Sequence, residues 1–172
     1  MMLWRMVLIV LIVAGFGHSA GAPEYAVKAA YLFNFARFTE WPNLGAAANF
    51  TVCLYGKDPF GGFLEEAVRG KQAHGMPVAI RRVTARDEAL ESCQVLFFGN
   101  SAQLDPVLSR LRGQSILTVG ESESFTAHGG MIGLVMDSGS VRFDLNLVAV
   151  AAAHLQVSSR LIEMGRVVGT KK

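Results

Sequence analysis

Between Phe50 and Val119 the chain alternates β-favouring runs with helical segments, and this order restricts the possible folds more than any other feature of the sequence. Strands are expected over residues 50–55, 76–83, 93–98 and 115–119. Helices are expected between them, over residues 60–69, 86–91 and 103–112. Strands joined through helices lie parallel in one sheet, with helices on both faces. The sequence therefore predicts a single three-layer α/β domain.

The alternation of strands and helices stops in the C-terminal third of the chain. Residues 130–136 and 141–145 predict two strands, and the short segment Asp137–Ser140 between them predicts a tight turn and therefore an antiparallel hairpin. The sheet is thus expected to be mixed but mostly parallel. One long helix is expected over residues 147–168, because apolar residues recur there at steps of three and four. Its stripe would pack against the sheet or against a second copy of the chain.

An aromatic stretch, Glu24–Pro42, precedes the predicted sheet. Helical spacing places one apolar stripe on it, and Pro42 is expected to end the helix. The stripe consists of Val27, Ala30, Tyr31, Asn34, Phe35, Phe38 and Trp41. Leu32, Phe33 and Ala36 fall outside this stripe, so the helix is apolar on more than one side. Either its own domain buries the helix from two sides, or part of it is left for a partner.

The N-terminus predicts export from the cytoplasm. Arg5 precedes the unbroken apolar run Met6–Gly17, which is short for a membrane span, and small residues follow it. This order is typical of a secretory signal peptide over residues 1–21, with the cut near Gly21 and a mature domain over residues 22–172. An uncleaved membrane anchor is the alternative. Both leave the body of the protein outside the cytoplasm.

Charge and cysteine content narrow the function classes. Arg5 is one of 16 basic residues, so the mature chain keeps 15 basic against 14 acidic residues. This balance does not provide the excess of positive charge that is typical of a nucleic-acid-binding surface. Cys53 and Cys93 are the two cysteines. An oxidising compartment favours a disulfide between them, worth about 4 kcal/mol for a loop of about 40 residues, while two buried free thiols are the alternative.

No catalytic constellation, cofactor motif or metal site follows from the sequence. The turn Gly56–Gly62 lacks both the G-x-G-x-x-G spacing and the ending of a P-loop, and Gly120–Ser124 lacks G-x-S-x-G. The histidines of the mature chain lie far apart in the sequence, so they do not show the close spacing that is typical of metal ligands.

His154 is the exception among the histidines, because it interrupts the predicted C-terminal stripe. Arg142, Asp144 and Arg160 could lie near it and form a polar corner in an apolar ligand groove. A buried histidine with a satisfied hydrogen bond, together with ordinary capping and ion pairing, explains the same residues.

The chain resembles the YfiR-like family of exported proteins. The most specific block is the aromatic stretch from Tyr31-Leu32-Phe33-Asn34-Phe35 to Thr39-Glu40-Trp41-Pro42. The resemblance continues through Gly56–Gly61, Cys93, Leu96–Phe98, Ile116–Gly120, Gly129–Ile132, Val141–Asn146 and Ser158–Leu161. It covers nearly the whole mature chain.

The resemblance implies a periplasmic regulator with no enzymatic activity and no cofactor. Relatives of this kind bind the periplasmic sensor domain of an inner-membrane diguanylate cyclase and repress it, which lowers cyclic di-GMP. In the best-known system an outer-membrane lipoprotein sequesters the repressor. The resemblance further implies a homodimer and a disulfide between Cys53 and Cys93. Some relatives carry a second cysteine pair that this chain lacks.

The aromatic helix supplies the candidate partner contacts, namely Phe33, Phe35 and Trp41, because aromatic side chains dominate interface energies. Two other functions compete with repression of a cyclase. One is a periplasmic small-molecule sensor or solute-binding module that acts on another membrane signalling protein through the groove near Arg142, His154 and Arg160. The other is an exported hydrolase.

Overall fold

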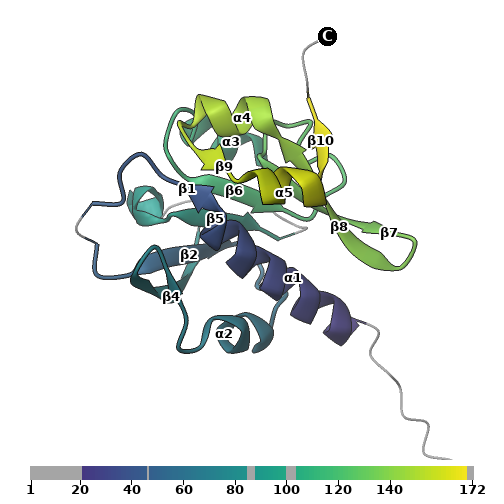
Figure 1. Cartoon of the computed structure of the whole chain (residues 1–172), viewed down its shortest axis with the longest axis horizontal. Coiled ribbons are helices and arrows are strands. Elements are labelled where there is room, and N and C mark those ends of the chain that lie inside the picture. The colour runs from purple at the N-terminus through teal and green to yellow at the C-terminus, as the bar shows by residue number, and fades with distance from the viewer. Residues whose placement is uncertain (1–20, 46, 85–87, 100–103, 170–172) are drawn as a thin grey trace, which may run out of the picture.

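A computed structural model describes residues 21–45, 47–84, 88–99 and 104–169 (Figure 1). Its helices are α1 (Gly21–Arg37), α2 (Phe63–Val68), the 3₁₀ helix η1 (Glu88–Ser92), α3 (Leu104–Arg110), α4 (Leu147–Ala152) and α5 (Ser159–Met164). Its strands are β1 (Thr39–Glu40), β2 (Phe50–Tyr55), β3 (Gln72–Ala73), β4 (Met76–Val83), β5 (Val95–Phe98), β6 (Leu117–Gly120), β7 (Ile132–Asp137), β8 (Ser140–Asn146), β9 (Gln156–Val157) and β10 (Arg166–Val168). The predicted leader, residues 1–21, lies almost entirely outside the described residues.

Within these residues, eight strands form one sheet in the order β10-β8-β7-β6-β5-β2-β4-β3. The five strands β4, β2, β5, β6 and β7 run parallel. The hairpin strands β7 and β8 pair antiparallel, and β10 returns parallel to β8 at the edge. The predicted mixed, mostly parallel sheet with a C-terminal hairpin is therefore confirmed.

Successive side chains of the central strands point to opposite faces of the sheet, and the buried residues form two cores. On β2, Phe50, Val52 and Leu54 face the core shared with α1 and α2. Cys53 and Tyr55 face the opposite core, which also contains side chains of η1 and α3. The second core holds the disulfide between Cys53 and Cys93, which confirms that pairing. Both faces of the sheet are covered, as expected of strands with such continuous apolar runs.

The first helix differs from its prediction in two ways. It ends at Arg37, and Thr39–Glu40 then pairs with Gln156–Val157 as a small two-stranded sheet, so Pro42 does not end the helix. The predicted stripe is also not the buried face of the helix, since two of its members, Val27 (45% exposed) and Ala30, are exposed. Phe35 of the predicted stripe is buried, and the other buried side chains of the helix are Lys28, Ala29, Leu32, Phe33 and Ala36. A helix enclosed from two directions buries a face wider than one stripe.

The prediction of one long helix over residues 147–168 was wrong, because α4, β9, α5 and β10 occupy this range. The backbone turns at His154, whose φ of 57° is left-handed, and this ends α4. Leu155 then returns to the core, and Ser158 starts α5 by accepting a hydrogen bond from the backbone N–H of Leu161. Spacing at steps of three and four therefore spanned four separate elements. The exposed ring of His154 interrupts no apolar stripe.

A buried ion cluster fixes α1 to the sheet. The Lys28 ammonium lies 2.8 Å from a carboxylate oxygen of Glu121, at the carboxyl end of β6, and 2.5 Å from Glu24 one turn earlier on the helix. The side chains of Lys28 and Glu121 are each only 5% exposed. The Tyr25 hydroxyl donates to the same Glu121 carboxylate. Burial lowers the pKa of Lys28, but its hydrogen bonds to Glu121 and Glu24 outweigh burial and raise it above its usual range.

Candidate protein-binding groove

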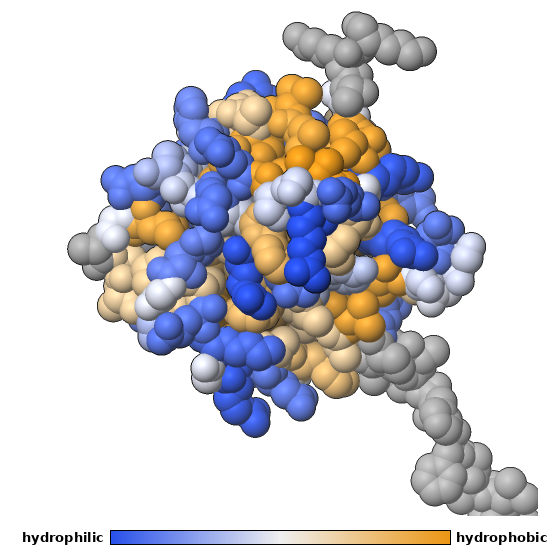
Figure 2. Space-filling model, viewed as in Figure 1, coloured by the Kyte–Doolittle hydropathy of each residue, from blue (hydrophilic) through white to orange (hydrophobic). Residues whose placement is uncertain are grey.

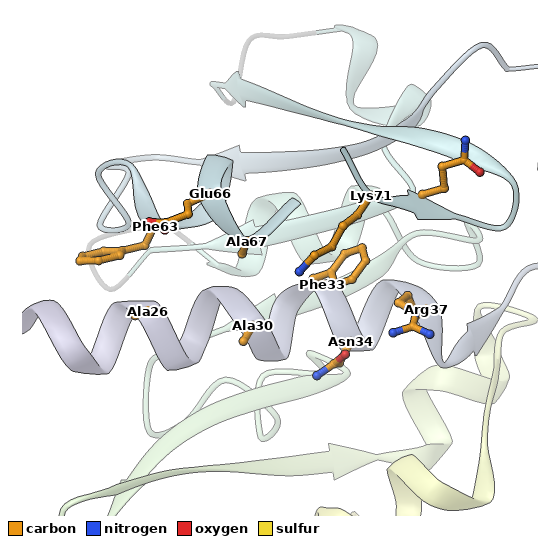
Figure 3. Close-up of a pocket in the computed structure, with 10 residues that line it drawn as sticks. Ala26, Ala30, Phe33, Asn34, Arg37, Phe63, Glu66, Ala67 and Lys71 are labelled. Atoms are coloured by element: carbon orange, nitrogen blue, oxygen red, sulfur yellow. The ribbon is translucent and has the colours of Figure 1, made fainter. Parts of the chain in front are cut away.

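A groove of about 760 Å³ runs between α1 and α2 (Figure 3). Alanines lie on both helices where they face each other, so the helices leave an open channel between larger side chains. The lining residues are Ala26, Ala30, Phe33, Asn34, Arg37, Phe63, Glu66, Ala67, Lys71 and Gln72. Apolar surface bordered by a few charged groups is the usual composition of a protein-binding site.

Phe33 lies in this groove between two cations. The Lys71 ammonium is 4.9 Å from the centre of the Phe33 ring, and the Arg37 guanidinium carbon is 5.7 Å from it. Figure 3 shows Lys71 reaching from the segment after α2 toward the ring. Although Phe33 is only 7% exposed, the groove opens onto it. The groove can therefore bind a side chain through apolar contact while cations hold its polar neighbours.

The other two predicted partner contacts lie elsewhere. Phe35 is fully buried, with its ring centre 4.9 Å from that of Phe143, so it is a core residue in this structure. Trp41 is partly buried and packs edge-on against Phe50, 5.1 Å between ring centres, and against His74. The structure thus places only Phe33 of these three in the groove.

The three residues of the predicted ligand groove are not brought together around a common hollow. Arg142 lies on β8 and lines two hollows beside the hairpin, neither of which is lined by His154 or Arg160. His154 ends α4 and is exposed. Arg160 lies on α5 with its guanidinium carbon 5.6 Å from the centre of the Phe38 ring.

The described residues contain no group of three or more histidine, cysteine, aspartate or glutamate side chains that could hold a metal ion. In the same part of the chain, no helix combines the length and the hydrophobicity that crossing a membrane requires. His74 forms a 2.9 Å hydrogen bond with the carbonyl of Ala36 and fastens the β3–β4 turn to the end of α1. This hydrogen bond helps to hold the end of α1 in place.

Sequence reasoning identified Phe33 but missed the groove around it. The signal was present in Ala26 and Ala30, which are spaced one turn apart on an otherwise aromatic helix. The opposite wall comes from α2, whose position against α1 cannot be read from local spacing.

A comparison with protein-family models matches residues 25–166 to the family described as YfiR/HmsC-like. That range includes every helix and strand from α1 to α5, apart from the first residues of α1. No curated protein matches the chain.

Proposed function

The chain belongs to the YfiR/HmsC-like family, and from this premise we propose that it binds the periplasmic sensor domain of an inner-membrane diguanylate cyclase and holds the cyclase inactive. The family indicates a regulator of diguanylate cyclase signalling. The observation that carries the proposal is the match itself, since it covers the groove and both cores. The protein would act after export, and the disulfide suits an oxidising compartment.

A protein of this kind needs no bond-making groups to control an enzyme. It must bind the inactive conformation of the cyclase more tightly than the active one. Moving a two-state receptor from mostly active to mostly inactive needs a differential affinity of about 10⁴-fold, or about 5.5 kcal/mol. A groove with an aromatic ring and two flanking cations can supply interactions of this size, because a few central residues usually carry most of the binding energy.

Two further partners belong to the proposal. An outer-membrane lipoprotein would compete for the repressor and so release the cyclase. A second copy of the chain would form a homodimer, for which the apolar surface over α4 and β10 in Figure 2 is suited. Val148 on α4 is 50% exposed, and within the part of the chain that the structure describes β10 is an edge strand with one unpaired side.

Deleting the gene is expected to raise cellular cyclic di-GMP, because a repressed cyclase becomes active. Deleting one particular membrane cyclase in addition should abolish the rise. Restoring the intact gene should lower cyclic di-GMP again, while a copy without residues 1–21 should not, since it would stay in the cytoplasm. Unchanged cyclic di-GMP after deletion, under conditions where the protein is made, would contradict the proposal.

Filling the groove is expected to weaken binding to the cyclase domain without weakening the fold. Ala30 is exposed and lines the groove, so Ala30→Arg should block it and reduce affinity at least tenfold, about 1.4 kcal/mol. Titration calorimetry with the purified periplasmic domain of the cyclase measures this.

The matched control is Ala127→Arg, an exposed alanine in the loop after β6 that does not line the groove. It should retain wild-type affinity. Equal losses for the two variants, or none for Ala30→Arg, would remove the groove from the binding site.

A further inference from the structure

Cations and aromatic rings alternate along the C-terminal end of α1 and across to α5. Beyond Phe33, the Arg37 guanidinium carbon also lies 5.4 Å from the Phe38 ring centre, and that of Arg160 lies 5.6 Å from the same ring. The order in space is thus Lys71, Phe33, Arg37, Phe38, Arg160. We call these five residues the cationic strip. It begins in the α1–α2 groove and leaves it at Phe38.

Building on the proposed function, we propose that the cationic strip binds an acidic segment of the cyclase's periplasmic domain, with carboxylates on the three cations and an apolar side chain in the adjoining groove. The partner is thereby defined by its chemistry as a peptide segment carrying acidic and apolar residues.

The three cations of the strip lack carboxylate partners among the described residues, where no ion pair within 4.0 Å involves any of them. Other cations of the chain do have such partners. Arg82 pairs with Asp58 and Glu65, and Arg166 pairs with Asp144. The formal charge of the chain is only +2, so three unpaired cations on one surface are a local concentration of positive charge, which Glu66 in the groove lining offsets only in part.

Ring contacts hold the cations in place without using up their donors. A cation over an aromatic face is attracted by the ring electrons, worth about 0.5–1 kcal/mol at exposed sites. A guanidinium has five N–H donors in its plane, and these suit a carboxylate in bidentate geometry. Arg37 also lies in the last turn of α1, where the helix dipole favours a positive charge. The strip is therefore preorganised for anions before a partner arrives.

An anionic membrane surface is the other candidate occupant, and the charge count disfavours it. Each basic residue near such a surface contributes about 1 kcal/mol, so three contribute about 3 kcal/mol, which gives only millimolar-range binding. A peptide segment gains from bidentate pairing and from the apolar lining of the groove in addition. Figure 2 shows hydrophilic side chains beside hydrophobic surface on the face that carries α1, the mixture expected of a protein contact.

Charge reversal of the strip tests the inference. The variant Lys71→Glu/Arg37→Glu/Arg160→Glu is compared with the control Lys57→Glu/Arg112→Glu/Arg142→Glu, which reverses three exposed cations outside the strip and has the same net charge. Both are titrated with the purified periplasmic domain of the cyclase at several salt concentrations. Thermal unfolding of each variant checks that it is folded.

The strip variant should lose at least a hundredfold in affinity, and its remaining binding should depend less on salt. The control should lose less than threefold. Equal losses in both variants, or retained binding by the strip variant, would overturn this inference and leave the proposed function standing. If the wild-type chain binds no cyclase domain at all, the proposed function falls and this inference with it.

A parallel arm uses vesicles of phosphatidylglycerol and phosphatidylcholine as the probe. The wild-type chain should bind them no better than the strip variant does. Vesicle binding that is lost only in the strip variant, with cyclase affinity unchanged, would make lipid the occupant and overturn the inference.

Discussion

Removing the disulfide is expected to lower the free energy of unfolding by about 4 kcal/mol. The bond joins Cys53 on β2 to Cys93 at the start of β5, across a sequence separation of 40 residues. In the unfolded chain it removes the entropy of a loop of that length. Since the free energy of unfolding of a single domain is typically about 5–15 kcal/mol, this loss would remove a large fraction of the total stability.

The double variant Cys53→Ala/Cys93→Ala, studied by urea unfolding, measures this effect. The wild-type protein in a reducing agent is the control, because these are the two cysteines of the chain and reduction changes nothing else in the covalent structure. Reduced wild type and the double variant should unfold at similar urea concentrations, both well below the oxidised wild type. A wild-type midpoint that does not respond to reduction would contradict a stabilising role.

Lys28→Met is expected to cost about 3–5 kcal/mol, because it removes one member of a buried ion pair, the cation 2.8 Å from the carboxylate of Glu121. The double variant Lys28→Met/Glu121→Gln removes the charge of the other member as well, so it should recover a large part of the loss. Urea unfolding of the two variants and the wild type gives both numbers. If the single variant were as stable as the wild type, the cluster would be wrongly assigned as the anchor of α1.

The same cluster predicts a pH dependence. The pKa of Lys28 is raised in the folded state, so its contribution is fully present below the unfolded pKa, about 10.4, and is lost as pH rises through the folded pKa. Burial, aided by Glu121, also raises the pKa of Tyr25, which acts in the same direction. The stability difference between wild type and Lys28→Met should therefore be constant from about pH 6 to 9 and shrink above about pH 10.5.

The central sheet was predictable because each of its strands carries a local signal. The runs around Val52, Leu96 and Val119 are apolar on both faces, which only a strand covered by two helical layers requires. The C-terminal region gave the opposite result. Its three-and-four spacing predicted one helix, but a left-handed residue at His154 and the cap at Ser158 divide it, and neither change is visible in a hydrophobic pattern.

The candidate site shows the same limit. Local reasoning selected the aromatic helix but could not tell the core residue Phe35 from Phe33, which lines the groove. That distinction depends on where α2 packs. Lys71 and Arg160 join Arg37 only through tertiary structure, and the pair of Lys28 with Glu121 spans 93 positions of the chain. The i,i+4 spacing of Glu24 and Lys28 was the one part of that cluster within reach of the sequence.

The central claim is that this chain inhibits a membrane diguanylate cyclase by binding its periplasmic side. Reconstituting the full-length cyclase in lipid vesicles, with the purified chain added on that side, tests this most directly through the rate of cyclic di-GMP synthesis. The rate should fall at least tenfold and saturate as the chain is titrated, and the strip variant should leave it unchanged. A synthesis rate that stays constant for every cyclase of the organism, at a large molar excess of folded chain, would contradict the claim.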